Sequence, residues 1–190
     1  MRVIAGRLGS RTLVAPRGSV TRPTTDRVRE ALFSMLGDVA ERRVLDLYAG
    51  TGALGIEALS RGASHATFVE RHAAALSALR RNLRALELDE QTTVVAARVE
   101  RARARLLPGA PYDLVFCDPP WDELSAALGQ TFALLTPDLL SPQGTLVVEH
   151  PTREPLGAGA TGRWRLVLTR HWGDTQVSLF APEMAENPLA

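Results

Sequence analysis

Two hydrophobic patterns alternate along most of this chain. Short apolar runs typical of buried strands occur at residues 43–47, 65–70, 92–96, 112–117 and 144–149. Between them, apolar residues spaced three and four apart predict helices at residues 53–61, 73–86, 99–107 and 124–135. Strands that alternate with helices indicate a parallel sheet with right-handed crossovers. The pattern therefore predicts an α/β fold built on a mostly parallel sheet.

The two ends of the chain carry a different pattern. Residues 2–5 and 11–14 flank a glycine-containing turn and predict a small hairpin. Thr24 or Thr25 can cap a helix that ends near Leu36. Near the other end, residues 163–171 and 175–180 predict an antiparallel hairpin that closes the sheet at seven strands.

Composition restricts the class of protein. The chain has 190 residues, of which 45% are hydrophobic and 23% charged, as expected for one globular domain. A single cysteine excludes an intrachain disulfide, and its place in a buried strand makes core packing the favoured role. The four histidines show no metal-ligand spacing, and no apolar run reaches the length of a membrane span. We therefore expect a cytoplasmic protein without a metal and without membrane contact.

Charge is unevenly distributed although the net charge is only +1. The first 25 residues contain no acidic residue, but they contain the arginines Arg2, Arg7, Arg11, Arg17 and Arg22. A guanidinium group pairs with phosphate and stacks on bases. We interpret residues 1–22 as a basic extension that contacts nucleic acid and residues 23–190 as the main domain. A solvated terminal tail is the alternative.

A glycine-rich turn follows the first predicted strand. The spacing Gly50-x-Gly52-x-x-Gly55 permits a tight turn, close approach of a ligand and close packing of a helix on a strand. Asp46 lies four residues before the first glycine, and Glu70 ends the next strand, where an acid can accept hydrogen bonds from ribose hydroxyls. An ordinary βα turn with surface acids is the alternative interpretation.

The strand at residues 112–117 ends in the tetrapeptide Asp118-Pro119-Pro120-Trp121. Two prolines fix φ and remove two backbone donors, so neither sheet nor helix continues. A rigid corner with a carboxyl group, outward carbonyls and a flat ring suits a planar group that carries an amine. A proline-rich turn with an aromatic plug is the alternative. Because both motifs close strands, we expect them to face one crevice at the edge of the sheet.

Three segments together resemble the RsmD family of bacterial 16S ribosomal RNA guanine-N2 methyltransferases. They are residues 22–33, which begin Arg-Pro-Thr-Thr-Asp-Arg, residues 46–63 around the glycine turn, and the corner at residues 118–121. The similarity extends over nearly the whole chain. It implies a Rossmann-like class I fold dependent on S-adenosylmethionine (SAM), with ribosomal RNA or the small ribosomal subunit as partner.

The resemblance also implies roles for single residues. The predicted catalytic residues are Asp118, Pro119, Pro120 and Trp121. The predicted cofactor-binding residues are Asp46, Ala49, Gly50, Thr51, Gly52, Glu70 and Arg71. The predicted RNA-binding residues are Arg2, Arg7, Arg11 and Arg22. The residue that contacts the adenine is left open between Arg98 and Glu100, because the family's usual polar position after the third strand is not evident.

Two other functions remain possible on the sequence alone. The corner would also serve a methyltransferase of DNA or of protein amines, although 190 residues leave little room for a DNA-recognition region. A non-catalytic RNA-binding module with a degenerate cofactor fold is the second alternative. The intact glycines, Glu70 and Asp118 argue against that module.

Overall fold

The computed structural model describes residues 1–16, 26–154, 156 and 163–183. In this part of the chain seven strands form one sheet in the order β3-β2-β1-β4-β5-β7-β6. The strands are β1 (Arg43–Leu47), β2 (His65–Glu70), β3 (Thr92–Ala96), β4 (Tyr112–Cys117), β5 (Leu140–Pro151), β6 (Trp164–Trp172) and β7 (Thr175–Pro182). The first five run parallel, and β7 is antiparallel to both β5 and β6. The mostly parallel sheet and its closing hairpin are as predicted.

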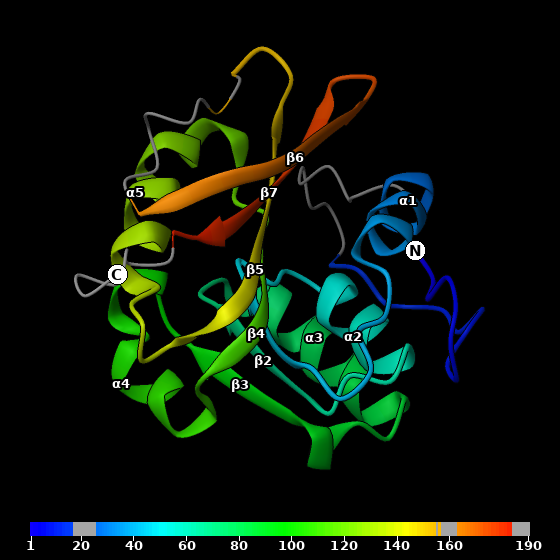
Figure 1. Cartoon of the computed structure of the whole chain (residues 1–190). Coiled ribbons are helices and arrows are strands. Elements are labelled where there is room, and N and C mark those ends of the chain that lie inside the picture. Colours follow the sequence, from blue (N-terminus) through cyan, green and yellow to red (C-terminus); the bar gives the residue numbers. More distant parts are fainter. Residues whose placement is uncertain (17–25, 155, 157–162, 184–190) are drawn as a thin grey trace.

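Helices cover both faces of the sheet (Figure 1). They are α1 (Asp26–Leu36), α2 (Ala53–Ser60), α3 (Ala73–Ala85), α4 (Arg103–Leu106) and α5 (Leu124–Leu134), with short 3-10 turns η1 (Asp89–Gln91), η2 (Val99–Arg101), η3 (Leu107–Gly109) and η4 (Trp121–Glu123). α1, α2 and α3 pack on one face, and α4 and α5 on the other. Side chains alternate between the faces along each strand, so Val44 joins the first hydrophobic layer while Leu45 and Leu47 join the second.

Two predicted elements differ in form from the structure. The single helix expected at residues 99–107 is η2, α4 and η3 in succession. Its buried residues explain the break, because Val99 and Ala102 are three apart, as in a 3-10 turn, whereas Ala102 and Leu106 are four apart. β5 begins at Leu140, earlier than predicted, and pairs with β4 through a register irregularity that accommodates a proline and a glycine.

The amino-terminal segment, residues 1–16, packs on the main domain. The predicted hairpin contains one β-bridge, Arg2 to Thr12, supported by backbone hydrogen bonds. Val3, Leu8 and Leu13 are buried in the first hydrophobic layer. The predicted helix caps Thr24 and Thr25 lie outside the described residues, as do Arg17 and Arg22.

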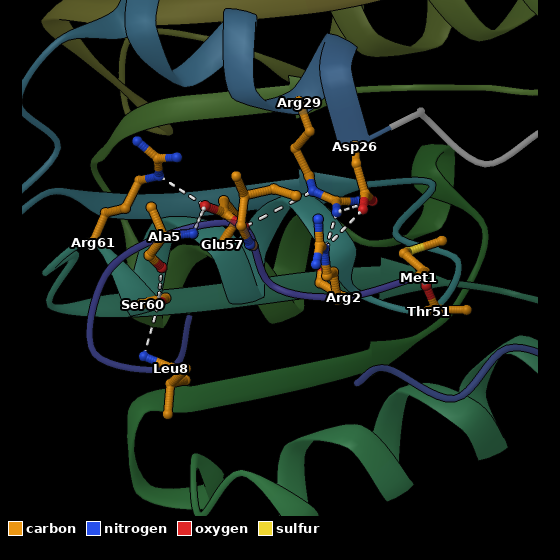
Figure 2. A network of polar contacts seen from close by, with 12 residues as sticks. Met1, Arg2, Ala5, Leu8, Asp26, Arg29, Thr51, Glu57, Ser60 and Arg61 are labelled. Carbon is orange, nitrogen blue, oxygen red and sulfur yellow. Dashed lines mark hydrogen bonds and ion pairs between the residues drawn. The ribbon is translucent and has the colours of Figure 1, made fainter. Parts of the chain in front are cut away.

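One buried carboxylate joins this segment to α2. Glu57 is 0% exposed and accepts the backbone N–H groups of Ile4 at 2.7 Å and Ala5 at 3.0 Å. It also accepts from Arg61 Nε at 2.8 Å. Figure 2 shows Arg61 and Ala5 on one side of this carboxylate and Arg29 on the other. Glu57 therefore connects the segment and α2 through a single charged group.

Arg29 completes the network from α1. Its guanidinium is fully buried and lies 3.9 Å from Glu57. Its Nη2 donates to the Arg2 carbonyl and to Asp26 Oδ1, while Nε and Nη1 have no hydrogen-bond partner among the described residues (Figure 2). The cost of burying this positive charge is therefore offset mainly by the nearby carboxylates of Asp26 and Glu57.

We expect Glu57→Gln to lower the free energy of unfolding by about 3–5 kcal/mol, because it removes one of the two carboxylates near the buried Arg29 charge, leaving only Asp26, and places an amide opposite backbone donors. Urea denaturation followed by circular dichroism measures this change. Glu90→Gln, at an exposed position in η1, is the matched control and should change the value by less than about 0.5 kcal/mol. Equal stabilities for the two variants would show that the buried charge does not organise this region.

None of the helices in the described residues has the length and apolar composition that a membrane-spanning helix needs.

Candidate active site

Three strand ends lie side by side at one edge of the sheet. β1 lies between β2 and β4, and its last residue, Leu47, pairs with Val69 on one side and Cys117 on the other. The chain continues from these ends into a glycine loop (residues 48–52), into Glu70 and into Asp118. The two motifs predicted to share a crevice are therefore brought together.

The glycine loop has an unusual backbone. Tyr48, Gly50 and Gly52 all adopt positive φ, at 60°, 57° and 83°. For Tyr48 this conformation is strained, and its ring is held in the second hydrophobic layer with its hydroxyl near the Ala127 carbonyl. Among the residues that the structure describes, a side chain added at Gly50 would meet nothing nearer than the Tyr48 carbonyl oxygen at 4.0 Å. The backbone at Gly50 therefore borders open space that a ligand can enter.

The other two glycines are needed for packing. A Cβ at Gly52 would lie 2.4 Å from Leu79, and one at Gly55 would lie 2.4 Å from the Phe68 ring on β2. Asp46 Oδ2 accepts the Gly55 N–H at 2.9 Å, which satisfies a donor in the first turn of α2. Burial raises the pKa of Asp46, the Gly55 hydrogen bond opposes this, and the charges of Asp118 and Glu70 raise it further. Asp46 thus holds the start of α2 from the strand beneath it.

Glu70 binds backbone groups on both sides of the end of β2. Its Oε2 accepts the Gly50 N–H at 2.8 Å, and its Oε1 accepts the N–H groups of Arg71 at 2.6 Å and His72 at 2.7 Å. Ala49 adds a backbone bond, donating to the Val69 carbonyl at 3.0 Å. One carboxylate therefore holds the glycine loop against the end of β2.

The corner at residues 118–121 leads into η4. Pro119 is buried, whereas Asp118, Pro120 and Trp121 are partly exposed. Asp118 is close enough to the buried Asp46 and Cys117 for its charge to raise the pKa of both. For the Cys117 thiol, burial is the largest cause and places the pKa at about 12, which suits the packing role expected for it.

Arg71 joins the two motifs across the edge of the sheet. Its Nη2 lies 2.6 Å from Glu123 Oε1 in η4. The pair is partly exposed, with side-chain accessibilities of 31% and 44%. The end of β2 and the turn after the corner are therefore connected by an ion pair.

The arginines predicted to bind RNA have different surroundings. Arg2 Nε pairs with Asp26, and Arg7 Nη2 donates to Gln91 at 2.7 Å, while Arg11 is exposed. Arg22 lies outside the described residues. Among the residues left open for the adenine, Arg98 and Glu100 lie 3.9 Å apart as an ion pair.

Asn82 is a residue of this site that the sequence patterns did not reveal. It lies on α3, is 2% exposed, and forms a double hydrogen bond with the Val14 backbone, accepting at 2.8 Å and donating at 3.1 Å. The same amide group donates to the Thr51 carbonyl in the glycine loop at 3.0 Å. The one signal in the sequence was the position of Asn82, a polar residue on the otherwise apolar face of α3. Asn82 joins the amino-terminal segment to the glycine loop.

Within the described residues, no group of three or more His, Cys, Asp or Glu side chains is arranged to hold a metal ion.

Comparison with known proteins identifies the family. The family model described as "Conserved hypothetical protein 95" matches residues 1–181. "Putative rRNA methyltransferase YlbH" of Bacillus subtilis is 42% identical over 188 residues, which cover 95% of this chain and 98% of that protein. "Ribosomal RNA small subunit methyltransferase D" of Escherichia coli is 42% identical over 125 residues, 64% of this chain and 60% of that protein. The chain belongs to the RsmD family.

A solved structure agrees with this membership. "Putative methyltransferase yhhF from Escherichia coli" superposes with a TM-score of 0.82 at 34% identity, over 96% of this chain and 98% of that one. The RsmD-family chain therefore has a Rossmann-like class I methyltransferase fold, in which the sheet is mixed because β7 is antiparallel.

We expect Asn82→Asp in this RsmD-family chain to loosen the glycine loop. The carboxylate keeps the acceptor for Val14 but turns an oxygen, in place of a donor, toward the carbonyls of Val14 and Thr51. We expect the free energy of unfolding to fall by about 1–3 kcal/mol. We also expect faster amide hydrogen exchange at Gly50 and Gly52, measured by NMR. Asn82→Gln offers the same groups on a longer side chain and should restore part of the protection. Unchanged exchange in Asn82→Asp would show that the amide does not hold the loop.

Proposed function

We propose that the chain transfers a methyl group from SAM to the exocyclic N2 amine of a guanine in 16S ribosomal RNA. Two relatives are named as rRNA methyltransferases, and family membership supports the same class of reaction here. The observation that carries the proposal is the adjacency of the glycine loop, Glu70 and the Asp-Pro-Pro-Trp corner at one edge of the sheet. A nicotinamide enzyme would need the first two features but not the third.

The residues at the edge fit a nucleoside cofactor. Glu70 Oε1 already accepts two backbone donors, whereas Oε2 accepts only Gly50 among the described contacts. Because a carboxylate oxygen has about two acceptor sites, Oε2 can accept a ribose hydroxyl as well. The open space beside Gly50 leaves room for the ligand. The proposed cofactor site also includes Ala49, Thr51 and Gly52 of the glycine loop, and Arg71, which follows Glu70. Asp46 supports this site indirectly, by holding the first turn of α2.

The corner is suited to hold and orient the base. When bound, SAM supplies a methyl group made electrophilic by its sulfonium. The guanine amine is a weak nucleophile because its lone pair is delocalised into the ring. Hydrogen bonds from the amine to the Asp118 carboxylate and the Pro119 carbonyl would localise that lone pair and aim it. Stacking on Trp121 would contribute roughly 1–3 kcal/mol, and the base must leave its stack to reach the corner.

The amino-terminal segment supplies the RNA contact in this proposal. Residues 1–22 are basic, and Arg7 and Arg11 are exposed in the described part of this segment. Exchanging the Arg7 contact with Gln91 for a phosphate costs little, because a neutral acceptor is replaced by a charged one. Arg2 and Arg22 complete the proposed set, and Arg2 would have to share its guanidinium with Asp26.

The proposed activity is tested by incubating the protein with labelled SAM and either 16S rRNA or assembled small subunits. The modified nucleotide is then mapped by mass spectrometry. A target site synthesised with inosine in place of guanosine lacks the N2 amine and should accept no methyl group. Equal labelling of the inosine substrate would reject the N2 assignment, and labelling of DNA or protein but not of RNA would reject the substrate class.

Asp118→Ala should slow single-turnover methyl transfer by a factor on the order of a hundred to a thousand, about 2.7–4 kcal/mol of transition-state stabilisation. The reason is the loss of one acceptor for the amine, while both prolines keep the local backbone. Asp122→Ala is the control, because it removes an exposed carboxylate that follows Trp121 in η4 and has no proposed contact with the amine. The control should react at the normal rate. A near-normal rate in Asp118→Ala would assign the corner a structural role.

Arg7→Gln and Arg11→Gln should each weaken RNA binding and reduce its salt dependence by about 0.7–0.9 in the slope of log K against log salt concentration. Each substitution removes one proposed phosphate contact and leaves the buried residues of the segment in place. Deleting the segment would be less informative, because Val3, Leu8 and Leu13 belong to the core. Arg153→Gln, an exposed position after β5, should leave the slope unchanged. If the slope is also unchanged in both Arg7→Gln and Arg11→Gln, the proposed role of residues 1–16 in RNA binding is wrong.

A further inference from the structure

A cavity of about 350 Å³ opens at the end of the sheet opposite the candidate active site. The active-site motifs follow the carboxyl ends of β1, β2 and β4, whereas this cavity is lined from the amino ends of the strands. Arg43 and His65 are the paired first residues of β1 and β2, and Thr93 lies on β3. Arg105 on α4 and Gly109 in η3 line it from the layer that covers the sheet.

The hydrophobic pattern changes at this cavity. On β1, side-chain alternation places Arg43 on the same face as Leu45 and Leu47, which are buried in the second hydrophobic layer. On β2, His65 and Thr67 precede the buried Val69 on that face. Polar residues at positions that face a core are unfavourable unless they have a function. This end of the face is therefore built for polar contacts.

The cavity carries positive charge. Its lining includes two arginines, Arg43 and Arg105, and none of its described lining residues is acidic. Burial and the Arg43 charge lower the pKa of His65, so the arginines supply the charge. Ser64, Thr67 and Thr93 add hydroxyls, of which that of Thr93 shares a hydrogen bond with His65 Nε2 at 3.0 Å. Asp113 is nearby and accepts the Arg43 backbone N–H at 2.9 Å, but it does not line the cavity. Among the described residues neither Arg43 nor Arg105 forms an ion pair; Arg105 donates to the Ala96 carbonyl at 3.2 Å.

We propose that this cavity binds a phosphate group, with Arg43 and Arg105 supplying the charge and the hydroxyl of Thr93 a hydrogen bond. The planar guanidinium fork matches phosphate oxygens, and hydroxyls add neutral donors. The volume lies at the lower end of the range for small-molecule sites. The phosphate belongs either to an RNA backbone or to a phosphorylated small molecule. The site stands apart from the proposed methyl transfer and does not depend on it.

The test is an NMR titration of the protein with sodium sulfate, compared with sodium chloride at equal ionic strength. Saturable shifts of the Thr93 and Gly109 amides are expected with sulfate only. The double variant Arg43→Gln/Arg105→Gln should bind sulfate at least about tenfold more weakly, the scale of losing a charge-assisted hydrogen bond. Arg84→Gln, an exposed position on α3, is the control and should bind as the unmodified protein does. If the double variant does not fold, Arg105→Gln alone tests the site. Its side chain is exposed, so the substitution should not affect folding.

Two further ligands distinguish the sources of the phosphate. Competition with sulfate by a short single-stranded RNA, lost in the double variant, would assign the site to an RNA backbone. Competition by a nucleoside 5′-monophosphate but not by RNA would assign it to a small molecule. Shifts that do not saturate, that map elsewhere, or that persist unchanged in both Arg105→Gln and the double variant would overturn the proposal.

Discussion

The buried carboxylate of Glu57 is the contact on which the amino-terminal half of the structure depends. Two ionised side chains, Glu57 and Arg29, are removed from water, which costs several kcal/mol per ion unless hydrogen bonds and opposite charge compensate. The compensation comes from backbone groups of residues 1–5 as well as from Arg61. The segment is therefore part of the folded domain, since without it the carboxylate would lose two of its donors.

Glu70 has the corresponding role at the carboxyl edge of the sheet. A strand-end acid would contribute little to stability if it only awaited a ligand, but here it accepts three backbone N–H groups. The geometry that leaves acceptor capacity on Oε2 also holds Gly50 in its positive-φ conformation. Binding and stability cannot be separated by changing this residue, so a loss of cofactor affinity after its substitution would not by itself identify a ribose contact.

The sequence predicted what depends on periodicity and on rigid local chemistry. The parallel arrangement of β1 to β5 follows from alternating βα units. The glycine spacing predicted a tight turn and close packing of a helix on a strand; the structure has Gly50 and Gly52 at positive φ in that turn and Gly55 of α2 against Phe68 of β2. Contacts between distant segments were not accessible, because Glu57, Arg29 and Asn82 lie on helices where charged or amide residues usually face solvent. His150 is a further case: it directly follows the strand predicted at residues 144–149, and in the structure it is fully buried in β5 beside Ser178.

Asn82 connects these two regions, and its place in the fold has a consequence for substrate recognition. One amide holds the Val14 backbone on one side and the Thr51 carbonyl on the other. A movement of the amino-terminal segment that stretched the Val14 pair would therefore also disturb the loop beside Gly50. RNA that binds the segment with the Asn82–Val14 hydrogen bonds intact would stabilise the observed conformation of the glycine loop. A ligand that binds beside Gly50 in that conformation would then favour RNA binding by the same free energy, because coupling between two binding sites is reciprocal. The arrangement would make the two proposed binding events energetically dependent without any contact between the ligands.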